Sequence, residues 1–370
     1  MTSFEDKKVI VVFGANGPEG TAVVKAFTRL REAGNDEYLI RAVVPSVDDS
    51  EYQFLQSLVD EMHDSSTDTN FRKALTGAYG VYIANNYFVD LDINREMKEL
   101  KRIQDYSISL GIKHVVLSCA EDTRPFVGKR RDILFWQKTA PGGRDPTHFC
   151  PPYDAKGAAA DGFATTVPTT KLYPAFNVDL FLSYMNPIEE NGKGYTLLLP
   201  VSRKVKIPVV TSDDIGSMAC AIFQDPQRVG VTVGVKSDEL TGVEMAALFS
   251  QVFNVPVEFK NVSYEEFSHS GLPGAAAISN MLRFIAHDEK YALRRRQPPG
   301  LKSLMQHMSP LATFQSWVQD NEEDIRAKYF GAAGELGELE ELAENTTYHD
   351  DGSVATKVHH DVEGGEVEWV

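Results

Sequence analysis

The sequence KKVIVVFGANGPEGTAVVKAFTRL, residues 7–30, indicates the fold of this chain. Residues 9–13 form an unbroken apolar run, which is typical of a strand buried on both faces of a parallel sheet. Gly14, Gly17 and Gly20 follow at three-residue spacing, and apolar side chains then recur at helical spacing. A doubly wound fold holds a dinucleotide pyrophosphate in this way, because glycines admit the phosphates and the helix N-terminus supplies amide donors.

The glycine spacing is GxxGxxG, whereas the dinucleotide-binding fingerprint is GxGxxG. Glycine turns also join ordinary strand–helix units, so fold geometry without binding is the alternative interpretation. The place of the motif on the first strand of the chain favours a dinucleotide site.

The rest of the first half alternates strands with helices. This alternation predicts an α/β fold, a Rossmann-type doubly wound parallel sheet with right-handed crossovers. The expected strands after the first are residues 38–44, 77–84 and 113–118, and the expected helices are 51–62 and 93–110.

The second half is expected to form a smaller α+β C-terminal domain. Residues 195–200 and 205–210 are interpreted as the strands of a hairpin-like region. The predicted domains are 1–170, with 205–235 returning to it, then 171–204 together with 236–330, and finally a tail, 331–370.

Two segments differ in composition from the rest. Residues 120–152 are basic and rich in proline and glycine, which indicates a surface excursion, either a solvated loop or a functional one. Residues 331–370 are rich in Gly, Glu and Asp, so we expect a mostly disordered acidic tail with one short helix at 336–344.

The composition argues against several classes of protein. The formal net charge of −16 disfavours nucleic-acid binding, because the phosphate backbone would be repelled. Cys119, Cys150 and Cys220 are far apart, so neither a disulfide framework nor a zinc site is expected, and the histidines show no ligand spacing. The polar N-terminus is unlike a signal peptide, and no apolar run is long enough to cross a bilayer. We expect a soluble intracellular protein of the cytoplasm, with the nucleus as a second location.

Seven segments in order carry a family resemblance. The chain resembles the NmrA-like proteins, atypical members of the short-chain dehydrogenase/reductase superfamily, and among them the redox-sensing NmrA-like proteins of eukaryotes. This resemblance implies an NAD(P)-binding Rossmann domain, a smaller C-terminal domain and a cofactor between them. It also implies that many members bind nucleotide as regulators without dehydrogenase activity. The segments are VVFGANGPEG, GAYGVYIANNYF, GIKHVVLSCAED, YDAKG, YPAFNVDLF, LPGAAAISNMLRF and TFQSWVQDN.

The resemblance also implies the positions of a cofactor site. The pyrophosphate loop corresponds to Gly14, Ala15, Asn16, Gly17, Pro18, Glu19 and Gly20. The residues expected along the cofactor are Asn85, Asn86 and Tyr87. Lys156 matches the lysine that reaches the nicotinamide ribose. The segment beside the nicotinamide corresponds to Pro174, Ala175, Phe176 and Asn177.

The region after the second strand departs from the family pattern. Members that prefer NADP carry an arginine there for the 2′-phosphate, whereas this chain has Pro45 and Ser46, followed by Asp48 and Asp49. The cofactor is therefore NAD or NADP, and we expect NADP(H) to bind no better than NAD(H). A preference for NADP(H) would point to Arg41 or the basic insert.

The phosphate loop itself carries two unusual residues. Pro18 removes one amide donor but suits the first helical turn. Glu19 either places a negative charge near the pyrophosphate or simply complements the helix dipole.

Catalytic residues are not clearly defined by the sequence. Reductases of the superfamily use a tyrosine acid with a lysine four residues later, but Tyr153 precedes Lys156 by only three. Pro151 and Pro152 come directly before, so we expect the helix to begin at Lys156. Tyr153 is a candidate acid or, alternatively, a packing residue.

Two neighbouring residues at the end of the fourth expected strand carry side chains that could take part in a reaction. Ser118 resembles the serine position of the superfamily but also suits a turn. Cys119 is expected to be inert, because nothing nearby in the sequence would lower its pKa.

Three functions remain open from the sequence. The leading hypothesis is a dinucleotide-binding regulatory protein, a redox sensor with little or no dehydrogenase activity whose nucleotide occupancy alters binding to a protein partner. The first alternative is an NAD(P)H-dependent reductase. The second is a scaffold that has lost nucleotide binding.

Overall fold

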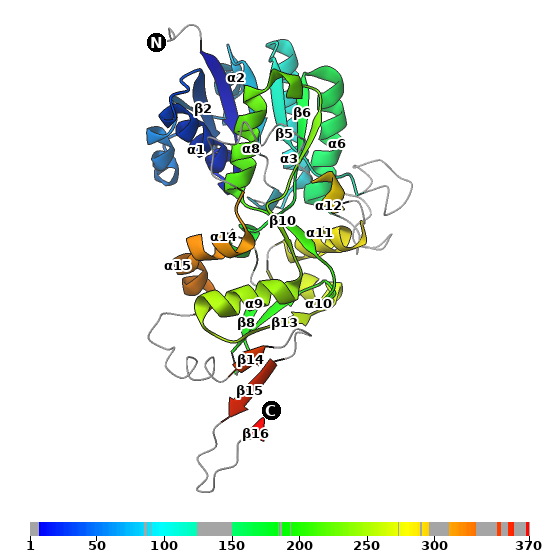
Figure 1. Cartoon of the computed structure of the whole chain (residues 1–370). Coiled ribbons are helices and arrows are strands. Elements are labelled where there is room, and N and C mark those ends of the chain that lie inside the picture. Colours follow the sequence, from blue (N-terminus) through cyan, green and yellow to red (C-terminus); the bar gives the residue numbers. More distant parts are fainter. Residues whose placement is uncertain are drawn as a thin grey trace. The chain divides into compact units, whose positions relative to one another are not determined.

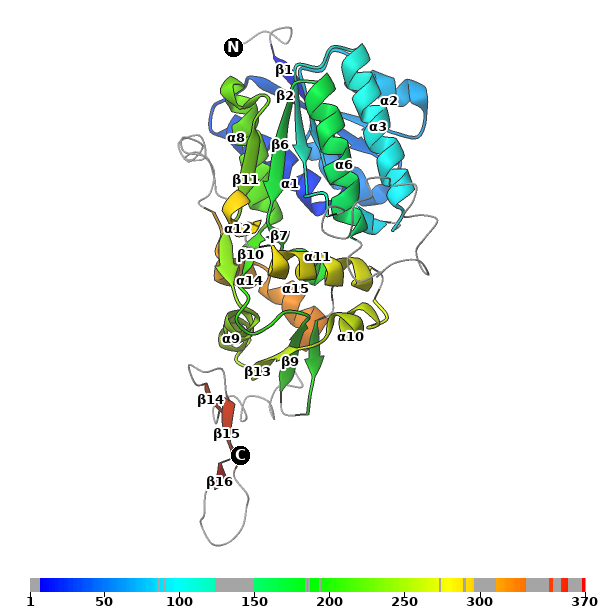
Figure 2. The ribbon, with the colours of Figure 1, turned by 90° about the vertical axis from the view of Figure 1, so that its right-hand side faces the viewer.

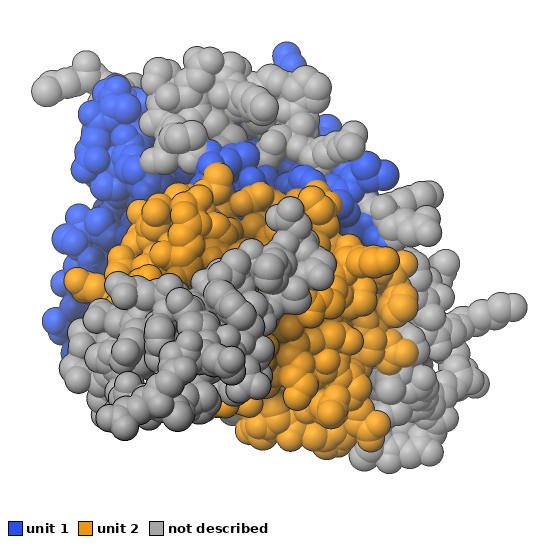
Figure 3. Space-filling view, turned by 60° about the horizontal axis from the view of Figure 1, so that its bottom comes forward, with its two compact units in different colours: residues 1–179, 210–237, 288–312 blue, residues 180–209, 238–287, 313–370 orange. Residues whose placement is uncertain are grey.

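The computed structural model describes thirteen stretches of the chain and divides it into two compact units (Figure 3). Unit 1 comprises Met1–Asp179, Val210–Ser237 and Asp288–Ala312, and unit 2 comprises Leu180–Val209, Asp238–His287 and Thr313–Val370. The described residues are 7–84, 87–89, 91–123, 150–183, 185, 187–192, 194–272, 274–288, 291–295, 311–330, 346–348, 354–358 and 368–369. Most of the basic insert and the helix expected at 336–344 lie outside them.

Unit 1 is built on a seven-stranded parallel sheet, as predicted for a Rossmann-type fold. The strand order is β11-β6-β5-β4-β1-β2-β3. The chain reverses its direction of travel across the sheet between β1 and β4, which is where doubly wound folds bind ligands. The strands are β1 Lys8–Phe13, β2 Tyr38–Val44, β3 Glu61–Asp64, β4 Gly80–Ile83, β5 His114–Ser118, β6 Thr169–Pro174 and β11 Thr232–Val235.

Helices cover both faces of this sheet, as Figures 1 and 2 show. The alternating side chains of β1 explain why, since Ile10 and Val12 join one apolar core and Val11 and Phe13 join the other. The first core contains residues of α1 and α8, and the second contains residues of α2, α3 and α6. The helices are α1 Pro18–Glu32, α2 Asp68–Leu75, α3 Ile93–Ser109, α6 Pro151–Thr166 and α8 Ser212–Gln224.

The helix expected at residues 51–62 is wrong. A 3-10 helix, η2 (Ser50–Ser57), is followed by β3, which pairs in parallel with the end of β2. The carboxylate of Asp49 accepts a hydrogen bond from the Glu51 amide and starts the 3-10 turn. The backbone amides and carbonyls on the outer edge of β2 need hydrogen-bond partners. Residues 61–64 supply these partners as a strand, which a helix could not do.

The expected start of one helix is also corrected. Helix α6 begins at Pro151 instead of Lys156, because both prolines occupy the first turn, where a missing amide costs nothing. Helix α8 is capped by Thr211, whose hydroxyl accepts from the Asp214 amide at 3.1 Å.

Unit 2 contains a second, smaller sheet. Strand β9 (Tyr195–Leu199) pairs antiparallel with β8 (Ile188–Glu190) and parallel with β13 (Val257–Asn261). Strand β10 (Ile207–Val210) pairs antiparallel with β12 (Asp238–Leu240) in a separate sheet. The predicted hairpin between 195–200 and 205–210 is therefore wrong, because each strand has a partner from a more distant part of the chain.

Helices of unit 2 pack against these strands, and two of them begin with capping boxes. Thr241 and Glu244 form one box, and Ser263 and Glu266 form the second. The helices are α7 Leu180–Ser183, α9 Gly242–Phe253, α10 Tyr264–Ser268, α11 Ala275–His287, α14 Phe314–Asp320 and α15 Glu322–Ile325, followed by a π-helical turn, η7 Arg326–Phe330.

Three short strands are described in the acidic tail. They are β14 (Thr346–Tyr348), β15 (Val354–Val358) and β16 (Glu368–Trp369), and they pair antiparallel in this order. The composition of this segment did not predict them.

Candidate functional site

The glycine turn, residues 14–20, joins β1 to α1 at the carboxyl edge of the sheet. Gly14 has φ +71°, and a Cβ there would lie 2.3 Å from the carbonyl oxygen of Ala84. A Cβ on Gly20 would lie 2.1 Å from the carbonyl oxygen of Gly14. Both positions therefore require glycine. Gly17 has more room, and its amide donates to the Gly14 carbonyl at 3.0 Å, which closes the turn.

The N-terminus of α1 is suited to an anion. Its N-cap is Gly17, which offers no side-chain acceptor for the first amides of the helix, and Pro18 follows at the first helical position. Amides at a helix N-terminus, with the helix dipole behind them, attract phosphates. The Thr21 hydroxyl holds the turn from inside by donating to the Ala15 carbonyl at 2.7 Å, while Asn16 is half-buried.

Glu19 is held by a residue that sequence reasoning missed. The hydroxyl of Tyr82, a fully buried residue of β4, donates to the Glu19 carboxylate. Burial, and then the neighbouring Glu19 charge, raises the pKa of Tyr82 well above its ordinary value. The Glu19 carboxylate is thus hydrogen-bonded to a residue of β4, close to the turn.

The region after β2 offers no basic side chain among its described residues. Pro45, Ser46, Asp48 and Asp49 follow the strand and are exposed. Arg41 lies within β2, where its guanidinium donates to the carbonyls of Ala74 and Thr76 and pairs with Glu61 at 3.1 Å. These contacts fix Arg41 in a structural role away from the carboxyl end of the strand.

The segment after β4 is described only in part. Asn85 and Asn86 lie outside the described residues. Tyr87 starts a short 3-10 turn, η3 (Tyr87–Val89), is half-buried, and meets Phe88 edge to face with ring centroids 5.6 Å apart.

Tyr153 and Lys156 both lie on α6, one helical turn apart. Tyr153 is only 6% exposed, and its hydroxyl lies 3.0 Å from the hydroxyl of Tyr291. Burial raises the pKa of Tyr153 well above its ordinary value. Lys156 is half-buried. The phenol is therefore enclosed and hard to ionise, which does not suit a proton donor working near neutral pH.

Helix α6 is fastened to the segment that follows β5. The carboxylate of Asp154 accepts from both the amide and the hydroxyl of Thr123, each at 2.7 Å. A Cβ on Gly157 would lie 2.5 Å from the Asp122 amide, so α6 passes directly against this backbone. Ser118 and Cys119 are buried beneath it, and burial raises the pKa of the Cys119 thiol, as expected of an inert cysteine.

A buried ion-pair cluster from α12 (Tyr291–Arg294) and the adjoining Arg295 lies beside Tyr153. The Arg295 guanidinium is fully buried, binds both carboxylate oxygens of Glu121, and lies 3.6 Å from the centroid of the Tyr291 ring. Burial alone would raise the pKa of Glu121, but Arg295 and Arg294 outweigh it and hold this pKa below its ordinary value. No sequence signal marked these residues.

The segment expected beside a nicotinamide is anchored within unit 1. The Pro174 carbonyl accepts from Arg295 Nε at 3.2 Å, and the Ala175 amide donates to the Val235 carbonyl at 2.9 Å. Phe176 is buried, and the Asn177 amide group donates to the Ser212 hydroxyl at 2.9 Å. Arg295 thus joins Glu121 to Pro174, and its contact with Tyr291 links both to Tyr153.

The described ranges contain three cysteines and no candidate metal centre. No cluster of three His, Cys, Asp or Glu side chains gathers in them as a metal ion would require. Every helix described is too short or too polar to span a bilayer. Cys119, Cys150 and Cys220 are free thiols and all three are buried.

This chain is similar in sequence to proteins of one family. A sequence model of the NmrA-like family matches residues 6–138 and 160–314. The NmrA-like family domain-containing oxidoreductase ptmS of Penicillium ochrochloron is 25% identical over 308 residues, which cover 79% of this chain and 87% of that protein.

Two solved structures illustrate the likeness in fold. NmrA, a negative transcriptional regulator solved with NAD, has a TM-score of 0.62 and 15% identity, and the match covers 85% of this chain and 95% of that one. The Citrobacter sp. triphenylmethane reductase complexed with NADP(H) has a TM-score of 0.59 and 16% identity, with 84% and 99% covered. At these identities the match shows a shared fold.

Proposed function

The chain belongs to the NmrA-like family, and we propose that it is a dinucleotide-binding regulatory protein with little or no dehydrogenase activity. Two residue groups in unit 1 support this proposal. The glycine turn has the tight geometry that a pyrophosphate needs, whereas Tyr153, the candidate for the superfamily's tyrosine acid, is buried against Tyr291. A protein that keeps the glycine turn and buries Tyr153 is suited to sensing the nucleotide rather than reacting with it.

The enclosure of Tyr153 is the observation that carries the proposal. A general acid must reach the oxygen that it protonates, and it works best with a pKa near the working pH. The Tyr153 hydroxyl lies instead beside a second buried phenol, and its pKa is raised by burial. The fully buried Arg295, bonded to Glu121 and Pro174, fixes Tyr291 in this position.

The proposed regulatory role depends on thermodynamic linkage between nucleotide binding and the conformation of the protein. A nucleotide that binds two conformations of the protein with different affinities shifts the balance between them. We propose that this balance governs binding to a protein partner. Two proteins of similar fold have structures with a bound dinucleotide. The regulator NmrA was solved with NAD and the triphenylmethane reductase with NADP(H), which supports a nicotinamide dinucleotide as the ligand.

A reductase is the second candidate, favoured by one observation. Tyr153 and Lys156 lie on the same helix, three residues apart, so a movement of Tyr291 would expose an acid and a lysine on one face. The relative ptmS is named as an oxidoreductase, in keeping with this alternative.

Turnover measurements on three proteins distinguish the two candidates. The parent chain, Tyr153→Phe and Tyr291→Phe are assayed for oxidation of NADH and NADPH with a panel of carbonyl compounds and quinones. We expect no substrate-dependent loss of reduced cofactor from any of them. Turnover by the parent that Tyr153→Phe abolishes at unchanged cofactor affinity would establish the reductase and overturn the regulatory proposal.

A further inference from the structure

The first turn of α1 leaves few backbone amides for a ligand. An α-helix has four amides at its N-terminus that find no partner inside the helix. In α1 the amide of the N-cap, Gly17, is used within the glycine turn, and Pro18 has no amide hydrogen. The Thr21 amide already makes the first helical bond, to the Gly17 carbonyl at 2.9 Å. Of the four, the amides of Glu19 and Gly20 are therefore left to meet a pyrophosphate.

Glu19 contributes both one of these amides and a carboxylate. The residue begins the stripe of α1 that faces the sheet, because the buried residues Val23, Phe27 and Leu30 follow it at helical spacing. Its side chain is half-buried and reaches β4. An acidic side chain in the first turn of a helix is attracted to the amides there, as an anionic ligand is. The Glu19 carboxylate therefore competes with the ligand unless another group holds it.

Tyr82 of β4 is the partner of this carboxylate. Tyr82 lies opposite Val12 in the register of β4 and β1, and both side chains belong to the core that contains residues of α1 and α8. The fully buried Tyr82 hydroxyl donates to Glu19 Oε1 at 2.5 Å, within the range of a charge-assisted hydrogen bond. Burial, and then the Glu19 charge, raises the pKa of Tyr82, so the phenol keeps its proton and remains a donor.

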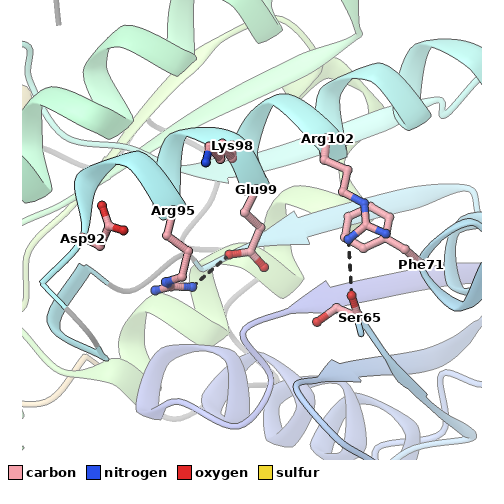
Figure 4. A pocket seen from close by; sticks show the side chains of 7 residues that line it. All are labelled: Ser65, Phe71, Asp92, Arg95, Lys98, Glu99 and Arg102. Carbon is pink, nitrogen blue, oxygen red and sulfur yellow. Dashed lines mark hydrogen bonds and ion pairs between the residues drawn. The ribbon is translucent and has the colours of Figure 1, made fainter. Parts of the chain in front are cut away.

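A hollow of about 460 Å³ elsewhere in unit 1 lies on the opposite face of the sheet from this pair (Figure 4). Its lining includes Phe71 and the cationic side chains of Lys98 and Arg102. Phe71 belongs to the core that contains residues of α2, α3 and α6, whereas Tyr82 belongs to the other core. The sheet thus separates the cations of the hollow from Glu19, and the amides of α1 are the donors toward which a released carboxylate would move.

We propose that Tyr82 is a positioning residue for the anion site of α1, because it binds the Glu19 carboxylate and keeps it off the amides that the pyrophosphate of the dinucleotide occupies. The proposal rests on the dinucleotide binding proposed above and adds a residue of β4 that controls its strength. A site that is open for part of the time loses apparent affinity in proportion to the open fraction. Loss of the Tyr82 hydroxyl therefore weakens the ligand without removing a contact to it.

The test is a calorimetric titration of the full chain with NAD in a cycle of two substitutions. Tyr82→Phe should weaken NAD by about tenfold, the effect of a carboxylate that occupies the amides for about nine-tenths of the time. Glu19→Gln should bind NAD at least as tightly as the parent, because a neutral side-chain amide competes poorly with a pyrophosphate. In the Glu19→Gln background, Tyr82→Phe should change the affinity by less than about threefold.

Two control variants match these substitutions in kind. Tyr38→Phe removes another buried hydroxyl of the same core, which donates to the Phe223 carbonyl at 3.2 Å. Tyr38 lies opposite Lys8 at the amino ends of β1 and β2, away from the glycine turn. Glu32→Gln removes an exposed carboxylate at the other end of α1. Both variants should bind NAD as tightly as the parent does.

The outcomes separate this proposal from the function on which it rests. Parent-like binding by Tyr82→Phe, or weaker binding by Glu19→Gln, would overturn the role of Tyr82 and leave dinucleotide binding intact. An equal loss from Tyr82→Phe in both backgrounds would show that Tyr82 acts through packing alone, which also overturns the proposal. Glu19→Gln keeps the Tyr82 hydroxyl and tests the competition by itself if Tyr82→Phe does not fold. Failure of the folded parent to bind NAD would overturn the proposed function and this proposal together.

Discussion

The hydroxyl of Tyr153 on α6 lies 3.0 Å from the hydroxyl of Tyr291 on α12, and both side chains are buried. This contact joins a candidate acid, Tyr153, to a segment 138 residues further along the chain. Under the proposed function this contact keeps Tyr153 from acting as a proton donor, and substitution of either tyrosine tests it.

Removing both hydroxyls should destabilise the protein by less than the sum of the two single removals. Tyr153→Phe and Tyr291→Phe each take away one member of a buried hydrogen bond, so each should lower the free energy of unfolding by about 1–2 kcal/mol. The double variant should lose less than the sum of the two, with a coupling energy of about 1 kcal/mol, measured by urea denaturation. Strict additivity would mean that the two phenols do not interact in solution.

The sequence predicted the parts of this site that depend on local pattern. The glycine turn could be recognised because its strand, glycines and helix are contiguous, and the close contact at Gly20 is with Gly14, six residues earlier. Arg295 could not be recognised, since its partner Glu121 lies 174 positions away and a buried arginine has no local signature. The same holds for Tyr82, whose contact with Glu19 requires the neighbouring strand to be in place.

The secondary structure shows a similar division between local and distant causes. Pro151 and Pro152 suggest a later start for α6, because proline breaks a helix interior. Proline is tolerated in a first turn, and the helix begins there. Strand β3 was missed because its four residues carry three charged or titratable side chains, and only the open edge of β2 draws them into the sheet.

A buried histidine should make the protein sensitive to mild acid. Burial lowers the pKa of His114 on β5 to about 4, and the ring bonds the Thr170 hydroxyl at 2.8 Å. Because the folded pKa is depressed below the unfolded value of about 6.5, the stabilising contribution is complete above that pH. It is lost as the pH falls toward 4, by about 3 kcal/mol in total.

The measurement is the free energy of unfolding of the parent and of His114→Gln between pH 7 and pH 4.5. The parent should lose more stability than the variant over this range. His269→Gln, an exposed histidine of unit 2, serves as the control and should follow the parent. Parallel curves for the parent and His114→Gln would contradict the assignment.

The two glycines of the turn should differ in their tolerance of a methyl group. Gly20→Ala places a Cβ against the Gly14 carbonyl, so the backbone must shift, at a cost of about 2–3 kcal/mol in unfolding free energy. Gly17→Ala meets nothing closer than 3.5 Å and should cost about 1 kcal/mol or less. Thermal and urea denaturation of the two variants test this order, and the reverse order would show that the turn is not built as described.

Lys156 should contribute to dinucleotide binding through hydrogen bonds to ribose hydroxyls. A hydrogen bond from a charged donor is worth about 1.5–3 kcal/mol, so Lys156→Ala should weaken NAD(H) by about ten- to a hundredfold. Tyr153→Phe should change this affinity little, because its hydroxyl is directed at Tyr291. Unchanged affinity in Lys156→Ala would mean that the nicotinamide half of the ligand lies elsewhere.

Calorimetric titration of the full chain with NAD, NADH, NADP and NADPH tests the central claim most directly. Because the glycine turn is intact and the described residues after β2 include no cation for a 2′-phosphate, NAD or NADH should bind with one ligand per chain, and NADP(H) should bind no more tightly. The absence of binding heat with all four dinucleotides, in a protein shown to be folded, would contradict a nucleotide-responsive regulator and leave a scaffold in its place.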